Sequence, residues 1–154
     1  MKIIQAETPE QIDAARRLFR EYETSMDLDL CFQGFEAELA ELPGKYALPR
    51  GRLLIAFIDK DAAGCIALRD LGDGVCEMKR LFVRSRFRGQ KVGRYLIEQV
   101  IRNAREIGYS RMRLDTAPAK MAKAVQLYES HGFREIPAYY DNPNEDVIYL
   151  EIVL

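Results

Sequence analysis

The segment Leu81-Phe82-Val83-Arg84-Ser85-Arg86-Phe87-Arg88-Gly89-Gln90-Lys91-Val92-Gly93-Arg94 leads from an apolar strand, through a loop rich in arginine and glycine, into the start of a helix. A loop of this kind directs several backbone N–H groups and the positive end of the helix toward one point, which suits a pyrophosphate. Gly89 and Gly93 allow the backbone to approach such a ligand closely. Spacing alone leaves a second interpretation open, because glycine also begins helices for purely structural reasons.

The charges around this loop favour an anionic ligand. From Lys79 to Arg113 the chain has eleven Lys or Arg against Glu98 and Glu106, although its net charge is only −1. Segment 21–45 has the opposite balance, with seven Asp or Glu against one lysine, and we expect it to attract cations. The alternative is that both segments are ordinary solvated faces. A nucleic-acid partner is not expected, because the basic segment lacks interleaved exposed aromatics and the whole chain is slightly acidic.

The residues before the loop read mainly as strands. Apolar patterns predict strands at residues 2–6, 52–59, 63–71 and 75–83, and helices at 8–24 and 35–42. Thr8 and Gln11 have capping-box spacing at the start of the first helix. Lys60-Asp61 and Gly72-Asp73-Gly74 are suitable hairpin turns, so the last three of these strands should form an antiparallel meander.

The residues after the loop alternate between helix and strand. The pattern predicts helices at 92–107 and 120–130, and strands at 111–116, 133–136 and 147–153. A strand, a helix and a second strand in this order imply a parallel βαβ unit. The sequence therefore predicts a mixed α/β (α+β) fold, with an antiparallel first half, a parallel second half and the chemistry at their junction.

Length and composition favour one intracellular domain. The chain has 154 residues, enough for one hydrophobic core, so we expect a single domain over residues 1–154. We expect a cytoplasmic protein without a membrane partner, because no apolar run is long enough to cross a bilayer and no secretory signal is present. Cys31, Cys65 and Cys76 are widely spaced and include no CxxC pair, so neither a disulfide framework nor a metal site is expected.

Two motifs resemble those of a known family. Leu81-Phe82-Val83 followed by Arg88-Gly89-Gln90-Lys91-Val92-Gly93-Arg94 is similar to motif A of the GCN5-related N-acetyltransferase (GNAT) family, whose signature is Arg/Gln-x-x-Gly-x-Gly/Ala. Residues 124–133, Ala-Val-Gln-Leu-Tyr-Glu-Ser-His-Gly-Phe, resemble the A-x-x-L-Y-x-x-x-G-F block of that family. The resemblance implies a central mixed sheet flanked by helices, in which parallel strands splay apart at the coenzyme site.

The resemblance also implies a cosubstrate and a reaction. Acetyl-CoA would bind the motif A residues, and backbone N–H groups of Leu81, Phe82 and Val83 would hold the thioester arm. An amine would then attack the thioester directly, without a covalent enzyme intermediate and without a metal. Two residues depart from the family pattern: Lys91 replaces the first glycine of the signature, and Met121 stands where many relatives have an asparagine that contacts the coenzyme.

Three side chains are candidates for proton transfer. The resemblance makes Tyr128 the general acid for the leaving thiolate, although its spacing from Ala124 is also that of a packed helix face. Glu77 is the first candidate for the general base, because strand alternation puts it on one face with Lys79 and Leu81. Asp115 competes for that role, and a third alternative is that the amine arrives already neutral. His131 follows the last helix, where a capping or surface role is expected.

The acceptor is the least readable part of the sequence. By resemblance, residues 22–35 and 138–143 form the acceptor cleft, in which Asp27, Asp29 and Asp141 would favour a cationic amine between tyrosine walls. We expect a primary amine of a small molecule as acceptor. A protein N-terminal or lysine acetyltransferase is one alternative, and a non-catalytic acyl-CoA-binding or sensor module is another. The apolar segment 147–154 would either complete the sheet or pair across a homodimer.

Overall fold

Seven strands form one sheet in the part of the chain that the structure describes. The computed structural model describes residues 1–26, 34–144 and 146–154. The sheet order is β1-β2-β3-β4-β5-β7-β6. The strands are β1 (Lys2–Gln5), β2 (Arg52–Ile58), β3 (Asp61–Gly72), β4 (Val75–Val83), β5 (Arg111–Thr116), β6 (Arg134–Ile136) and β7 (Ile148–Val153). The helices are α1 (Pro9–Met26), α2 (Phe35–Glu41), α3 (Val92–Ile107) and α4 (Pro118–Ser130). The fold is the predicted mixed α/β class.

The first half is the predicted antiparallel meander. The capping box forms at the start of α1, where the Gln11 amide donates to Thr8 Oγ1 over 3.2 Å and the Thr8 amide donates to Gln11 Oε1 over 3.1 Å. Asp73 and Gly74 both have positive φ and close the β3–β4 hairpin, as expected for a tight two-residue turn. The β2–β3 turn is shifted from its predicted place, because Ile58 pairs with Asp61 and the residue with positive φ is Asp59.

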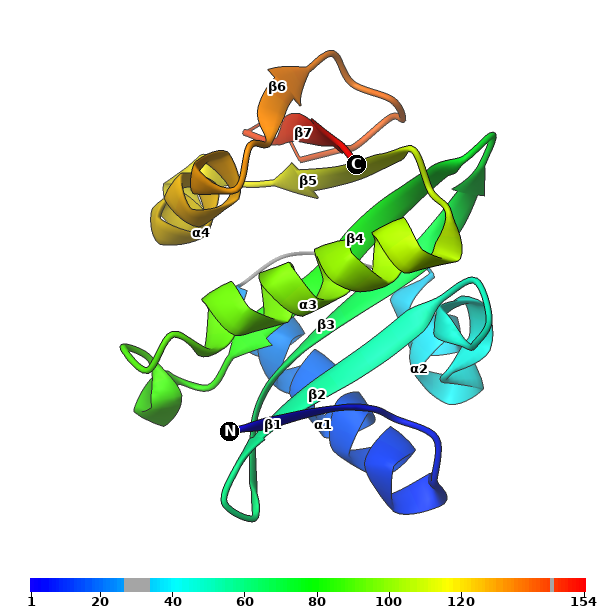
Figure 1. The fold of residues 1–154 in the computed structure, drawn as a ribbon. Coiled ribbons are helices and arrows are strands. Elements are labelled where there is room, and N and C mark those ends of the chain that lie inside the picture. The colour runs from blue at the N-terminus through cyan, green and yellow to red at the C-terminus, as the bar shows by residue number, and fades with distance from the viewer. Residues whose placement is uncertain (27–33, 145) are drawn as a thin grey trace.

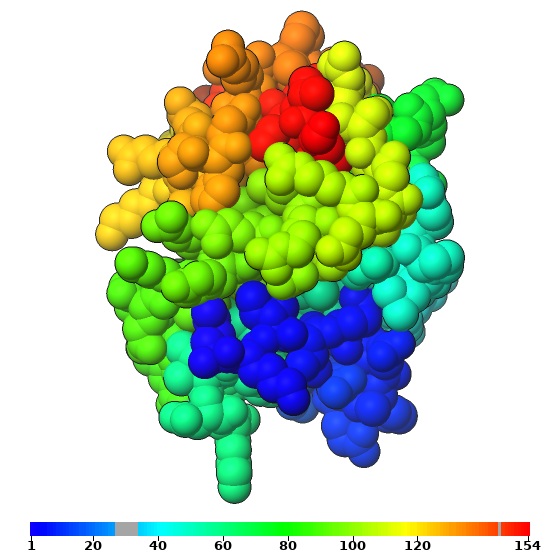
Figure 2. Space-filling model, in the orientation of Figure 1, coloured from blue at the N-terminus to red at the C-terminus, as the bar shows by residue number. Residues whose placement is uncertain are grey.

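Helices cover both faces of the sheet (Figure 1). One hydrophobic cluster joins the sheet to α3 and to Tyr128 of α4, and a second joins it to α1 and α2. Figure 2 shows α3 crossing the middle of one face, with the C-terminal strands and α4 on one side of it and β1 on the other. None of the helices in the described residues combines the length and the apolar character that crossing a bilayer requires.

The parallel pair β4 and β5 separates halfway along its length. The last paired residues are Glu77 and Arg113, although β4 continues to Val83 and β5 to Thr116. Beyond this point the two strands diverge, and the space between them opens toward the start of α3 and α4 (Figure 1). The expected splay therefore lies in the βαβ unit formed by β4, α3 and β5, which contains the parallel pair. The pairs β5–β7 and β6–β7 are antiparallel, so the second half of the sheet is parallel in this unit alone among the described strands.

A β-bulge at Arg80 interrupts the alternation of side-chain directions that was predicted along β4. Between the pairs Ala67–Lys79 and Cys65–Phe82, β4 has one residue more than β3, and Arg80 has a positive φ of 62°. The extra residue reverses the side-chain directions that follow it. Leu81 consequently packs in the cluster that includes α3, on the face opposite Glu77 and Lys79, so the prediction that all three share one face was wrong.

The C-terminal strand completes the sheet. β7 pairs with β5 on one side and with β6 on the other, both antiparallel. The pairing with β5 runs along the whole of β7, and the pairing with β6 involves Tyr149, Leu150 and Glu151. Of the two alternatives for segment 147–154, the structure has the first.

Candidate active site

The loop before α3 presents unpaired backbone donors. The first intrahelical bond of α3 runs from the Tyr95 amide to the Lys91 carbonyl, over 3.1 Å. The amides of Val92, Gly93 and Arg94 therefore precede the helical bonding pattern, and they form the positive end of the helix. A Cβ atom on Gly93 would lie 3.7 Å from Leu127 Cδ2, so this end of α3 borders α4.

Lys91 retains the backbone conformation that a glycine would give. Its φ of 64° and ψ of 21° lie in the left-handed region, and it is the N-cap residue of α3. Gly89, two residues earlier, also has positive φ, at 85°. A lysine costs about 1–2 kcal/mol more than glycine in this conformation. The departure from the family signature therefore leaves the backbone donors of the loop in place.

Part of the charge asymmetry in the sequence is balanced by ion pairs in the fold. The early acidic residues meet basic partners: Glu21 binds Arg84 at 2.6 Å, and Glu36 binds Arg20 at 2.5 Å. Glu38 also has an arginine partner, described below. The prediction that this segment attracts external cations is therefore wrong for these three carboxylates.

A small cavity occupies the space between the splayed strands. Its volume is about 50 Å³, and its lining includes backbone and side chains of β4 and β5 together with α1 and α4. Tyr128 and Asp115 both line this cavity, as do Lys79, Arg80 and Leu81. The structure thus brings together two of the three predicted proton-transfer candidates.

Tyr128 is almost fully buried, with 3% of its surface exposed, and its ring packs edge-on against Phe133 with 5.8 Å between centroids. Burial raises the pKa of its hydroxyl above the usual value for tyrosine. The side chain therefore stays protonated throughout the physiological pH range, as a general acid requires. Packing and a position on the cavity wall are both observed, so the two interpretations of this residue are compatible.

Asp115 is oriented by two donors from the segment after β6. The Tyr140 hydroxyl and the Asn142 side-chain amide both donate to Asp115 Oδ2, the latter over 3.2 Å. Asn142 is itself held, because its Oδ1 accepts from the Asn144 backbone amide at 2.9 Å. Burial raises the pKa of Asp115 above its ordinary value, although Lys79 opposes the rise. A carboxylate with a raised pKa is a better proton acceptor than an ordinary aspartate.

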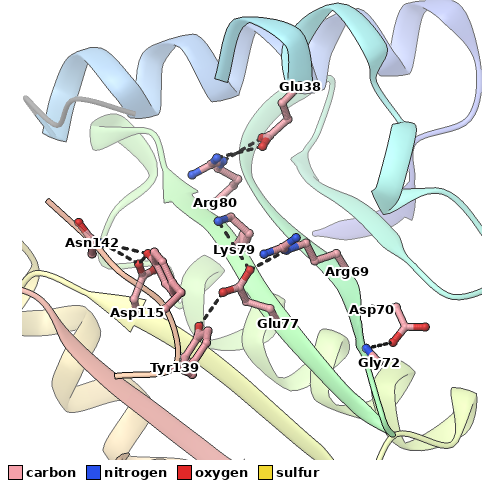
Figure 3. A network of polar contacts seen from close by, with 11 residues as sticks. Glu38, Arg69, Asp70, Gly72, Glu77, Lys79, Arg80, Asp115, Tyr139 and Asn142 are labelled. Atoms are coloured by element: carbon pink, nitrogen blue, oxygen red, sulfur yellow. Dashed lines mark hydrogen bonds and ion pairs between the residues drawn. The ribbon is translucent and has the colours of Figure 1, made fainter. Parts of the chain in front are cut away.

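Glu77 has a different environment, in which both carboxylate oxygens are occupied. Oε1 accepts from Arg69 Nε at 2.7 Å and lies 3.6 Å from Lys79 Nζ, while Oε2 accepts from the Tyr139 hydroxyl at 2.6 Å (Figure 3). Burial works to raise its pKa, but Lys79, Tyr139 and Arg69 together outweigh burial and hold the pKa below the usual range. Only 1% of its surface is exposed. This geometry describes the centre of a buried ionic network.

A second buried pair joins the bulge to α2. Arg80 donates from Nε and Nη2 to the two carboxylate oxygens of Glu38, at 2.9 and 3.0 Å, and both side chains are almost fully buried. The Arg80 guanidinium also lies 5.2 Å above the ring of Phe35. The bulge therefore has a defined function in packing, because it turns a charged side chain toward a buried partner (Figure 3).

A larger cavity lies on the α2 side of the sheet. Its volume is about 290 Å³, and the residues that line it are Glu38, Lys45, Arg69, Glu77, Lys79, Tyr140 and Asp141. Lys79 also lines the cavity between the strands, so the two cavities share a wall. Of the predicted acceptor residues, Asp141 and Tyr140 lie here. Asp27 and Asp29 fall outside the described residues.

Several site residues were missed or read differently from the sequence. Tyr139 and Tyr140 were predicted to give flat apolar walls, but their hydroxyls bind Glu77 and Asp115. The roles of Arg69 and Glu38 were not predicted, because nothing near them in the sequence marks their partners. Within the described residues, no group of three or more His, Cys, Asp or Glu side chains is arranged to hold a metal ion.

Two further predictions concern α4. Met121 has non-helical backbone angles that kink the helix, and its side chain lines the cavity between the strands. Thr116 Oγ1 lies 3.8 Å from its sulfur. His131 ends the helix, as predicted: its Nδ1 lies 2.8 Å from the Leu127 carbonyl oxygen and its Nε2 lies 3.4 Å from Glu98.

The splayed parallel pair lies beside a helix whose first amides have no intrahelical partner, and comparison with known proteins identifies the family that has this fold. The sequence model of the acetyltransferase (GNAT) family matches residues 12–133. An uncharacterized N-acetyltransferase of Schizosaccharomyces pombe is 40% identical over 146 residues, which cover 94% of this chain and 89% of that protein. The chain belongs to the GNAT acetyltransferase family.

Solved structures support the same fold. A GNAT-family acetyltransferase from Staphylococcus aureus superposes with a TM-score of 0.80 at 22% identity, covering 97% of this chain and 96% of that chain. A GNAT-family acetyltransferase from Elizabethkingia anophelis with acetyl-CoA bound has a TM-score of 0.59 at 25% identity, covering 73% of this chain and 82% of that chain.

Proposed function

We propose that this protein transfers an acetyl group from acetyl-CoA to a primary amine of a small molecule, by direct attack of the amine on the thioester. One observation carries the proposal: Asp115 and Tyr128 line the same cavity between the splayed strands, next to the unpaired amides that begin α3. The Elizabethkingia relative, whose structure contains acetyl-CoA, supports the choice of donor.

The coenzyme would bind along the opening between β4 and α4. Its pyrophosphate would accept hydrogen bonds from the amides of residues 92–94, with Gly89, Gln90 and Lys91 forming the loop around it. Arg88 and Arg94 would add electrostatic attraction, since both are exposed at this end of the molecule. The edge of β4 at Leu81, Phe82 and Val83, which β5 does not pair, would hold the thioester arm.

Asp115 and Tyr128 would carry out the two proton transfers of the reaction. The amine nitrogen forms a bond to the thioester carbonyl carbon and gives one proton to Asp115, whose Oδ2 is fixed by Tyr140 and Asn142. The carbon–sulfur bond then breaks, and the Tyr128 hydroxyl protonates the leaving thiolate. Asp115 gives its proton to solvent and Tyr128 takes one from solvent as the products leave, which restores the enzyme. The products are the N-acetylated amine and free coenzyme A.

The proposal favours Asp115 over Glu77 as the base. Both Glu77 oxygens are engaged and its pKa is lowered, whereas the Asp115 pKa is raised and its two donors, Tyr140 and Asn142, both bind Oδ2. Glu77 would instead fix the positions of Arg69, Lys79 and Tyr139.

A small acceptor is favoured by the size of the cavity on the α2 side. Its volume of about 290 Å³ is at the lower end of the usual range for small-molecule sites. Acetylation of a protein terminus or lysine remains the alternative within the same chemistry. A non-catalytic acyl-CoA-binding module would not need two proton-transfer groups, and is disfavoured by Asp115 and Tyr128 lining one cavity.

Calorimetric titration with acetyl-CoA tests the coenzyme site through Gly93→Asp. Gly93 is the second residue of α3, where an acidic side chain stabilises a helix, so the variant should fold at least as well as the wild type. The added carboxylate would nevertheless repel the pyrophosphate. Gly93→Asn is the matched control, with nearly the same volume and no charge.

We expect acetyl-CoA binding by the wild type, a modest loss in Gly93→Asn and at least a tenfold loss in Gly93→Asp. Circular dichroism would confirm that both variants are folded. Equal affinities for the two variants would exclude the pyrophosphate from this loop, and absence of binding by the wild type would remove the basis of the proposed reaction.

A further inference from the structure

The larger cavity has charged groups of both signs, arranged at different parts of its wall. Lys45, Arg69 and Lys79 supply cations, and Glu38, Glu77 and Asp141 supply carboxylates. Two of these carboxylates have their own partners, since Glu38 binds Arg80 and Glu77 binds Arg69 and Lys79. A uniformly acidic pocket, which a polyamine would require, is therefore not what the structure contains.

Arg69 retains donors that face the cavity. Its Nε binds Glu77 at 2.7 Å, and its side chain is 28% exposed. A guanidinium has five N–H donors in a planar fork, and one contact through Nε leaves the terminal nitrogens available for a planar anion. Lys45 is an exposed lysine on the same cavity wall. Together they form a cationic wall that suits a carboxylate.

The proton acceptor lies at another part of the same network. Figure 3 shows Asp115 and Arg69 on opposite sides of Glu77, with Lys79 between them and the α2 side of the network. Tyr140 lines the larger cavity and donates its hydroxyl to Asp115 Oδ2, so Asp115, which lines the smaller cavity, also borders the larger one. An acceptor with its amine at Asp115 would therefore place its other end near Arg69.

We propose that the acceptor is an amino acid, or another small amine that also carries a carboxylate, with the carboxylate bound by Arg69 and Lys45. This inference rests on the proposed function and specifies its substrate class. The amine nitrogen bonds to the thioester carbon and releases a proton to Asp115, the sulfur leaves with a proton from Tyr128, and the carboxylate is unchanged. Asp141, on the same wall, would accept a hydrogen bond from a polar side chain of the acceptor.

Matched acceptors that differ only in the carboxylate test the inference. Each of the common amino acids would be compared with its α-amide, and release of free coenzyme A thiol would give kcat/KM. An α-amide has the less basic amine, so more of it is neutral, and protonation alone would favour the amide. With kcat/KM expressed per neutral amine, which removes this difference, we expect the best acid to exceed its amide about tenfold, because a charge-assisted contact is worth about one such factor.

Three variants connect this preference to the wall. Arg69→Gln should lower the acid-to-amide ratio about tenfold through KM, and Arg69→Lys should recover part of it. Lys45→Gln should lower the ratio about threefold, and this exposed position avoids the risk of misfolding that Arg69 carries. Arg102→Gln, on the exposed part of α3, is the charge-matched control and should leave the ratio unchanged.

The outcomes separate this inference from the proposed function. Amides or simple amines acetylated as well as the acids, or a ratio unchanged in the Lys45 and folded Arg69 variants, would overturn the substrate class and leave the reaction standing. Binding of acetyl-CoA without acetylation of any acceptor would refute the reaction itself, and the substrate class with it.

Discussion

Glu77→Gln should lower the stability of the fold and keep the reaction rate, whereas Asp115→Asn should keep the stability and lower the rate. Both variants replace a buried carboxylate by an amide of the same shape. Glu77→Gln removes the negative charge between Arg69 and Lys79, whose side chains are 28% and 8% exposed. Breaking a buried ion pair in this way costs about 3–5 kcal/mol. Because the introduced glutamine could still accept the hydrogen bond from Tyr139, we expect the free energy of unfolding to fall by about 3 kcal/mol, the lower end of this range. This decrease corresponds to a Tm lower by roughly 6–12 °C for a chain of this size.

Asp115→Asn should leave stability unchanged or increase it. A carboxylate whose folded-state pKa is raised contributes stability below its unfolded pKa and loses it as pH rises through the folded pKa. At neutral pH, therefore, ionised Asp115 does not stabilise the fold, and its replacement removes a buried charge. As the proposed base it should nevertheless matter to the reaction, with a fall in kcat/KM of about 10² to 10⁴.

Urea unfolding at pH 7.5 and steady-state release of coenzyme A thiol measure the two quantities on the same preparations. The expected pattern is a destabilised Glu77→Gln that keeps most of its kcat at a temperature where it is folded, and a stable, inactive Asp115→Asn. A stable Glu77→Gln that has lost its rate, beside an active Asp115→Asn, would reverse the assignment and restore Glu77 as the base.

Three other predictions follow from the site and its surroundings. Lys91→Gly should raise Tm by up to about 4 °C. The variant removes about 1–2 kcal/mol of left-handed backbone strain, which exceeds the free-energy cost of the extra flexibility that glycine gives the unfolded chain. A lower Tm in a thermal melt would contradict this. Glu38→Gln should lower the free energy of unfolding, measured in urea, by about 3–5 kcal/mol, because Arg80 would stay buried without its carboxylate partner. A decrease below about 1 kcal/mol would show that the pair is dispensable. Protonation of the acceptor amine gives the pH profile of kcat/KM one acid limb, and uptake of a proton by Asp115 should add a second inflection, at a pH above the ordinary aspartate range because burial raises its pKa. This second inflection should disappear in Asp115→Asn, while the limb from the amine stays.

The sequence was sufficient for most of the fold because the signals that decide the elements are local. The helical period after Val92 predicted α3, and the spacing of Thr8 and Gln11 predicted the capping box that the structure contains. Asp73-Gly74 closes its hairpin with the expected backbone. Each of these features depends on residues within one turn or one hairpin of each other.

The bulge at Arg80 could not be predicted in the same way. A charged residue in a strand is normally read as a solvent-facing position, whereas Arg80 is buried and points toward Glu38 on α2. Its partner lies 42 residues away in the sequence. The same is true of Glu77, whose hydrogen bond from Tyr139 spans 62 residues, so its network became visible only once the chain was folded.

The coenzyme loop is an intermediate case. Its position and its expected ligand followed from residues 88–94 and from the resemblance to a family, and the free amides at Val92 and Gly93 agree with that expectation. The conformation of Lys91 was not readable from its residue type, because lysine rarely adopts a positive φ. The choice between Glu77 and Asp115 depended on long-range partners and stays a prediction.

The bulge at Arg80 also fixes how many residues β4 can have. Deleting Arg80 would restore regular pairing with β3, and Leu81 and Phe82 would keep their present faces, because the pairs Ala67–Lys79 and Cys65–Phe82 would both be retained. The deletion would instead leave Glu38 buried without its arginine partner. A relative that aligns here with a one-residue gap should therefore also lack an acidic residue at the position of Glu38.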